Sequence, residues 1–265
     1  MKDKGNYITV RDKSVVKAND LIQKSRFSLS LLQQKIVLYL ISQITAFDTD
    51  FKEYEFDIRE FCQVCGIDFD NGGNYGYLKE QIKAIADKSL WIKIQDEETL
   101  LRWIEKPYIN KKNGTIRIRL DKDMKPFLLQ LKANFTQYEL IYTLHFKSKY
   151  SIRLYELIKS IHYHENEAYE RIYTVEELKR LLDAEKYDTY QHFREKVLDK
   201  AIEEINKYSD KAITYQPIRV GRRIEKIHFT ISSKEIMERL KIRAEIDREM
   251  EFDPNQYSLW DKVES

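Results

Sequence analysis

The side chains closest to a catalytic arrangement are the two histidines of His162-Tyr163-His164, with Glu165 directly after them. Two imidazoles on one strand could hold a divalent cation, which would activate a DNA phosphodiester for attack by a tyrosine. The triplet, however, follows a predicted helix, and the helix downstream carries no Tyr-x-x-x-Tyr or Tyr-x-x-Lys pattern beside it. We therefore expect surface histidines, no metal and no catalytic residue. Metal-dependent strand nicking is kept as an alternative.

Two further patterns fit packing better than chemistry. Cys62-x-x-Cys65 has the spacing of half a zinc site, and the chain has no other cysteine to complete one or to form a disulfide framework. The segment from Asn71 to Gly76 is rich in glycine, but it lacks the Lys-Ser/Thr of a phosphate-binding loop. We expect core cysteines, a turn, and no cofactor.

Side chains suited to nucleic acid gather between residues 186 and 226. Arginine pairs with guanine edges and glutamine with adenine, while lysine and tyrosine bind phosphates. From Lys211 to Lys226 five basic residues accompany a single acid, Glu225. Acidic residues at 195, 199, 203 and 204 leave a merely solvated helix face open as an alternative. The candidate DNA contacts are Lys186, Tyr187, Thr189, Tyr190, Gln191, Arg194, Lys196, Lys200, Arg219, Arg222, Arg223 and Lys226.

Local patterns predict the elements that position these residues. Residues 147–161 carry one apolar stripe of a helix, and Thr174-x-x-Glu177 caps a short helix after it. A loop leads into a long helix over residues 189–208. Strands follow at 212–220 and 224–231, around Gly221-Arg222-Arg223. The buried face of the long helix is expected to hold Phe193, Val197, Leu198, Ala201, Ile202 and Ile205.

The first half of the chain repeats this order. Ser30 and Gln33 form a capping box before a long apolar helix, and Asp57-x-x-Glu60 caps a short one. A helix with Leu78, Ile82 and Ile85 then precedes strands at 90–94 and 115–120, the second just after the hairpin-type pair Asn113-Gly114. The two capped short helices start 117 residues apart, which indicates tandem copies of one unit.

The fold class that follows is α+β, with two tandem winged-helix domains. We expect the first at residues 1–135, the second at 136–233, and an acidic C-terminal tail of unknown role at 234–265, where nine acidic residues face six basic ones. The second helix of such a motif enters the DNA major groove and a basic wing reaches the backbone, although winged helices also serve as protein-binding modules. The first domain offers weaker contacts, because Glu80 and Asp87 accompany its lysines. They are Lys79, Lys83, Lys111 and Lys112.

Composition limits the class of protein further. Hydrophobic residues make up 42% and charged residues 34%, with only seven glycines and four prolines, which is typical of an ordered globular chain. No apolar run approaches a membrane span, and the N-terminus lacks the apolar core of a signal peptide. We expect a cytoplasmic protein with no membrane partner.

Several separated blocks, in order, resemble the initiator replication proteins of iteron plasmids, a tandem winged-helix family. They are VVKANDLIQKSRFSLSLLQQKIVLYLISQI, KSKYSIRLYELIKSI, YTVEELKRLLD and YDTYQHFREKVLDKAIEEIN. The similarity covers about residues 14 to 232, so the tail has no counterpart in it.

The resemblance implies a bacterial protein that binds directly repeated double-stranded sites at its plasmid origin, helps to melt the origin, and recruits the host initiator and helicase. It also implies a second domain that reads bases, with that role falling on Tyr190, Gln191, Arg194 and Lys196. Monomers in such a family bind the repeats, and dimers often repress their own gene. We expect self-association through the first domain, which has a long apolar helix and an aromatic-rich loop. A tandem winged-helix transcriptional regulator is the main alternative.

Overall fold

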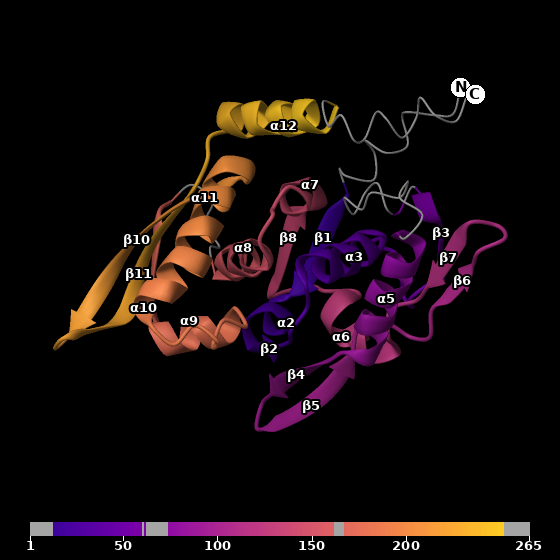
Figure 1. The fold of residues 1–265 in the computed structure, drawn as a ribbon, viewed down its shortest axis with the longest axis horizontal. Coiled ribbons are helices and arrows are strands. Elements are labelled where there is room, and N and C mark those ends of the chain that lie inside the picture. The colour runs from indigo at the N-terminus through magenta and orange to yellow at the C-terminus, as the bar shows by residue number, and fades with distance from the viewer. Residues whose placement is uncertain (1–12, 60, 62–73, 162–166, 252–265) are drawn as a thin grey trace.

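The computed structural model describes residues 13–59, 61, 74–161 and 167–251, and it forms two units that share an interface (Figure 1). The first half of the chain contains the following elements in order: β1 (Ser14–Ala18), α2 (Asn19–Lys24), β2 (Ser25–Arg26), α3 (Leu31–Ser42), β3 (Tyr54–Asp57), α5 (Asn74–Asp87), β4 (Ser89–Ile94), β5 (Glu97–Arg102), β6 (Tyr108–Asn110), β7 (Thr115–Ile118), η1 (Lys122–Met124) and α6 (Lys125–Leu128).

The second half contains β8 (Phe135–Glu139), α7 (Leu140–Leu144), α8 (Lys149–Ile161), β9 (Tyr169–Thr174), α9 (Val175–Leu181), α10 (Tyr190–Phe193), η2 (Arg194–Leu198), α11 (Asp199–Tyr208), β10 (Lys211–Val220), β11 (Arg223–Ser233) and α12 (Ile236–Glu251). The mixture of helices with small antiparallel sheets confirms the predicted α+β class.

The helix starts follow the predicted caps. The Ser30 side chain accepts a hydrogen bond from the Gln33 backbone amide, and the Gln33 side chain accepts one from the Ser30 amide, which completes a capping box. Thr174 Oγ1 accepts from the Glu177 amide at 3.0 Å and begins α9. The predicted long apolar helix is α3, and nine of its twelve residues are buried. It therefore runs through the core of the first unit.

The strands of the first unit pair differently from the two-stranded wing expected there. Strand β4 contains the strand predicted at residues 90–94. It pairs with β5, a strand that the sequence patterns did not predict. Strand β7 lies within the strand predicted at residues 115–120, and it pairs with β6 and β3. The predicted hairpin at Asn113-Gly114 is confirmed, and Gly114 adopts φ +66°, a value that favours glycine. Asn74, Tyr75 and Gly76, expected in a turn, lie instead in the first turn of α5.

The second unit has the complete order of a winged helix-turn-helix. Helix α8 packs against η2 and α11, α9 packs against β9 and β11, and a three-stranded sheet of order β10-β11-β9 closes the unit. All six residues expected on the buried face of that segment are buried. Strand β9 was not predicted.

Polar contacts join the two units. Strand β8, which begins at residue 135, pairs with β1 of the first unit in antiparallel register, and the boundary expected near residue 135 stays a prediction. Arg153 of α8 donates to the carbonyls of Ile22 and Leu181, at 3.3 and 3.2 Å. Ser28 donates to Asp183 at 2.9 Å. These contacts tie the turn after α9 to the first unit.

The segment expected only as an acidic tail contains α12, a helix that lies across the upper side of the molecule in Figure 1. Its Ile242 and Ile246 side chains are buried. Arg243 donates to Glu139 at 2.6 Å, close to the junction of the units. Within the described part of the chain, no helix is long and apolar enough to cross a membrane.

Candidate nucleic-acid interface

The candidate reading helix of the second unit begins at a capped, exposed turn. Thr189 Oγ1 accepts from the His192 amide at 3.2 Å, which fixes the first turn of α10. From there the buried residues of α10, η2 and α11 face the core, and the opposite face is open to solvent. The predicted contacts exposed on this face or on the turn before it are Lys186, Thr189, Gln191, Arg194, Lys196 and Lys200.

Three predicted contacts also have structural roles. Thr189 caps the helix, as described above. Tyr187 is half-buried and packs edge-on against Tyr150, with ring centroids 6.1 Å apart. Tyr190 is half-buried with its hydroxyl oxygen shielded from solvent, and burial raises the pKa of that hydroxyl. The helical spacing did not show these orientations: Tyr187 lies in the turn before α10, and Tyr190 is the first residue of α10.

The wing presents the densest basic cluster. Gly221 at φ +62° makes the turn between β10 and β11, and a bulge at Ile218/Arg219 interrupts the ladder just before it. All four predicted wing contacts are exposed: Arg219, Arg222, Arg223 and Lys226. Four cations at one end of a hairpin suit phosphates, which attract cations whatever the DNA sequence.

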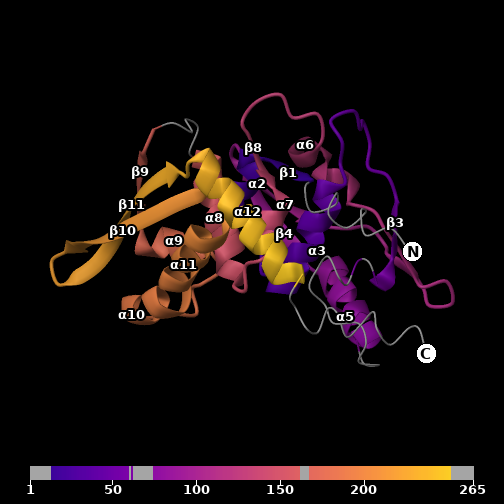
Figure 2. The same ribbon diagram turned by 90° about the horizontal axis from the view of Figure 1, so that it is seen from above.

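The corresponding helix of the first unit is less basic. Lys79 and Lys83 are exposed on α5, but Lys83 donates to Asp87, and this bond raises the pKa of Lys83. Figure 2 shows α5 and α10 both reaching the lower edge of the view, well apart along the molecule. Both candidate reading helices therefore lie on the same side of the molecule.

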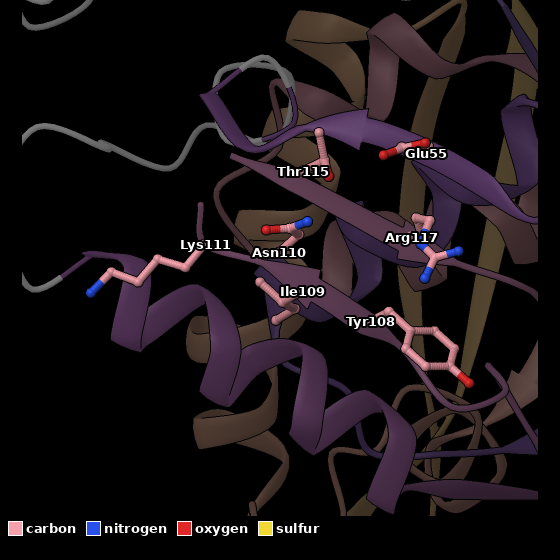
Figure 3. A pocket seen from close by; sticks show the side chains of 7 residues that line it. All are labelled: Glu55, Tyr108, Ile109, Asn110, Lys111, Thr115 and Arg117. Atoms are coloured by element: carbon pink, nitrogen blue, oxygen red, sulfur yellow. The ribbon is translucent and has the colours of Figure 1, made fainter. Parts of the chain in front are cut away.

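The hairpin of β6 and β7 contributes the remaining predicted lysines. Asn110 Oδ1 accepts from the amides of Lys112 and Asn113, each at 3.1 Å, and so closes the turn. Figure 3 shows the sheet surface beside it, a shallow pocket of about 510 Å³ from which Lys111 extends away. The guanidinium carbon of Arg117 lies 4.9 Å from the centre of the Tyr108 ring, and the same guanidinium donates to Glu53. This surface carries acidic as well as basic side chains, so its basic character is confined to the hairpin tip with Lys111 and Lys112.

A groove between the two units adds residues that the sequence patterns did not single out. It has a volume of about 340 Å³ and lies between the β4–β5 hairpin, α2 and the end of α9. Lys24, Arg26, Lys93 and Arg180 line it together with Trp91, whose surface is 52% exposed. The alternation of LWIKI gave a signal for two of them, because Trp91 and Lys93 alternate with buried Leu90 and Ile92.

The motifs considered for catalysis or metal binding fall on other parts of the chain. His162, His164 and Glu165, the cysteines at 62 and 65, and residues 71–73 all lie outside the described residues. Among the residues that are described, no group of three or more histidine, cysteine or carboxylate side chains is arranged to hold a metal ion.

Comparison with known proteins agrees with this architecture. Residues 14–159 match the family described as Initiator Replication protein, WH1, and residues 174–231 match Initiator Rep protein, WH2. The chain belongs to the initiator replication protein family. Both of its winged-helix domains are thereby shown, and the first match continues into α8.

Two relatives of this initiator family member are informative. A Replication initiation protein of Escherichia coli is 24% identical over 204 residues, which cover 74% of this chain and 63% of that relative, somewhat less than two thirds of its length. A crystal structure of Pi initiator protein in complex with iteron DNA has a similar fold, with a TM-score of 0.70 and 21% identity. That similarity covers 85% of this chain and 99% of the other.

Proposed function

We propose that this initiator family member binds directly repeated double-stranded sites at a plasmid origin and acts without catalysing a reaction. The observation that carries the proposal is the second unit, where an exposed polar helix face and a four-cation wing extend from one winged helix-turn-helix. A helix of this kind fits the major groove, and a basic hairpin fits the adjacent backbone. The solved relative, Pi initiator protein, is in complex with iteron DNA, which supports the same ligand here.

In this proposal the two units divide the work. Gln191, Arg194 and Lys196 contact base edges, and Arg219, Arg222, Arg223 and Lys226 hold phosphates. Lys79 and Lys83 of α5, with Lys111 and Lys112, add backbone contacts from the first unit. The groove with Trp91 and its four cations lies between the two sets. Origin melting and recruitment of the host initiator and helicase belong to the same proposal, and their support is family membership.

Self-association through the first unit is also proposed, on different grounds from those the sequence offered. The apolar α3 helix is buried in its own core, and the aromatic-rich loop falls largely outside the described residues. Strands β5 and β6 each stand at the edge of a three-stranded sheet, and an edge strand can pair with a second chain. Sedimentation of the full chain at tens of micromolar tests this, and a strict monomer would contradict it.

The function is tested on the DNA that flanks the gene. Footprinting with the full chain should protect several directly repeated segments of similar sequence. Protection of a single palindrome would favour a transcriptional regulator instead. Incubation of supercoiled plasmid with the protein and Mg²⁺ or Mn²⁺ should leave the DNA unnicked. A nicked product that a single tyrosine substitution abolishes would establish the metal-dependent alternative.

A further inference from the structure

The reading helix of the second unit contains a π-helical turn at the position of its main candidate base reader. Residues Arg194–Leu198 form this turn, and the Asp199 backbone amide donates to the Arg194 carbonyl, five residues back. In a regular α-helix, residues five apart are rotated by about 140° from each other, so their side chains diverge. Single π turns inside α-helices are frequent at functional sites.

The turn brings together two side chains of opposite charge. Arg194 Nε lies 3.5 Å from Asp199 Oδ2, with the two side chains 45% and 48% exposed. An exposed ion pair of this kind is weak by itself, because water screens it and both side chains lose rotamer freedom. The pair can orient the Arg194 side chain only if another group holds the Asp199 carboxylate in place.

A strand of the wing fixes the carboxylate. Tyr215 of β10 donates its hydroxyl proton to Asp199 Oδ1 at 2.6 Å. The Tyr215 ring packs against Phe229 of β11, with centroids 6.3 Å apart. Asp199 therefore has one oxygen tied to the wing and the other turned toward the arginine.

Both carboxylates lie on the Nε and Nη2 side of the guanidinium. Asp199 is 3.5 Å from Nε, and Glu195 is 3.8 Å from Nη2, which is too far for a hydrogen bond and leaves Nη2 able to donate to a base. The two terminal nitrogens form the edge that pairs with O6 and N7 of guanine. An arginine held in this orientation before binding loses less conformational entropy when it meets a base.

We propose that Asp199 and Tyr215 are positioning residues, which hold Arg194 in its base-reading orientation and so make sequence specificity depend on the wing strand. The inference rests on the proposed function, and in particular on Arg194 as a reader. It gives the wing a second role besides phosphate binding.

The test uses two duplexes and the full chain. One is a 30-base-pair duplex enriched from a random pool by the unsubstituted protein, and the other is a shuffled duplex of equal composition. Tyr215→Phe keeps the ring and removes the donor. We expect it to lower the ratio of the two affinities by roughly three- to tenfold, with the shuffled duplex bound as before. In an Arg194→Ala background, Tyr215→Phe should change the ratio no further.

A second pair of variants separates positioning from charge. Asp199→Asn and Glu203→Gln each remove one negative charge from the same exposed helix. Both should strengthen binding to the shuffled duplex, but only Asp199→Asn should lower the ratio. Melting temperatures accompany each measurement, because a purely structural role would lower stability and leave the ratio unchanged.

Three results would overturn the proposal. The first is an unchanged ratio in Tyr215→Phe and Asp199→Asn, while Arg194→Ala lowers it. The second is a loss of ratio in Tyr215→Phe that persists without Arg194. Either result leaves the proposed function intact. If Arg194→Ala itself leaves the ratio unchanged, the reading role fails and the positioning role fails with it.

Discussion

The corner between reading helix and wing is anchored in both units, but by opposite charges. In the first unit Lys88 follows α5, and its ammonium donates to Gln33 Oε1 of α3 at 2.8 Å in a half-buried position. In the second unit Asp210 follows α11 and accepts from Tyr155 Oη and Lys159 Nζ of α8, at 2.7 and 2.9 Å. Each corner is thus tied to the long helix of its own half of the chain.

The comparison separates what the repeated fold requires from what it leaves free. Both units need the corner held, because it sets the angle between helix and wing. Neither the sign of the charged residue at the corner nor its degree of burial is the same in the two units. The same freedom applies at the surface, where the second unit exposes a basic wing and the first exposes a lysine tied to Asp87. The predictions below test how far this difference extends.

The largest effect is expected at the buried corner. Asp210 is 5% exposed, so Asp210→Ala removes the buried carboxylate to which Tyr155 and Lys159 donate and should lower the free energy of unfolding by about 3–5 kcal/mol. Lys88→Ala removes one partly exposed hydrogen bond and should cost only about 0.5–1.5 kcal/mol. Urea unfolding at pH 7 measures both. Equal losses in the free energy of unfolding would show that the difference in burial between the two residues has no effect on stability.

The pH dependence of stability should change at the same site. Burial opposes ionisation of Asp210, but Lys159, Lys211 and the Tyr155 hydroxyl outweigh it and hold the pKa of Asp210 below its ordinary value of 3.8. A lowered pKa contributes stability above the unfolded-state value and loses it as the pH falls toward the folded-state value. Asp210→Asn should therefore flatten the loss of stability below about pH 4. A curve parallel to that of the unsubstituted protein would contradict the assignment.

An intermediate effect is expected from the helix lysines. Lys186→Ala with Lys200→Ala removes two exposed cations from the second unit, on the turn before the reading helix and on the helix itself, and should reduce the slope of log K against log salt by about 0.9 for each phosphate that is no longer neutralised. Lys79→Ala with Lys83→Ala should reduce it less, because Asp87 already neutralises Lys83. Titrations of one duplex at several salt concentrations compare the pairs. A greater reduction from the first-unit pair would reverse the ranking of the two helices.

The smallest effects are expected at the helix caps, where the two units resemble each other. Ser30→Ala and Thr174→Ala each remove a side-chain acceptor from a backbone amide and should each cost about 1 kcal/mol of stability. Thr174→Ser keeps the hydroxyl and should retain most of that stability. A cap variant without effect would mean that the start of its helix is held by tertiary packing alone.

The sequence predicted features that depend on local chemistry. The caps at Ser30 and Thr174, the hairpin at Gly114 and the buried face of the second reading helix all follow from short-range patterns, and all were confirmed. The basic wing was predicted in the same way, since Gly221 marks a turn whatever packs around it.

Features that depend on distant pairing were missed. Strands β5 and β9 are identified by their partners rather than by their own alternation, and β1 pairs with β8 across more than a hundred residues. The half-buried positions of Tyr187 and Tyr190 were missed because they depend on tertiary packing, such as the contact of Tyr187 with Tyr150. The π turn was missed because backbone hydrogen bonding, and not residue type, brings Arg194 beside Asp199.

The division between a base-reading helix and a phosphate-binding wing is the central claim, and one titration tests it. Arg194→Ala and the double variant Arg222→Ala with Arg223→Ala are each titrated on the enriched and the shuffled duplex at several salt concentrations. Arg194→Ala should cost about 1–3 kcal/mol on the enriched duplex and little on the shuffled one. The wing variant should weaken binding to both, and flatten the salt dependence by about 0.9 for each phosphate that the wing no longer neutralises. If the wing variant abolished sequence preference while Arg194→Ala changed only the salt slope, the two roles would be reversed.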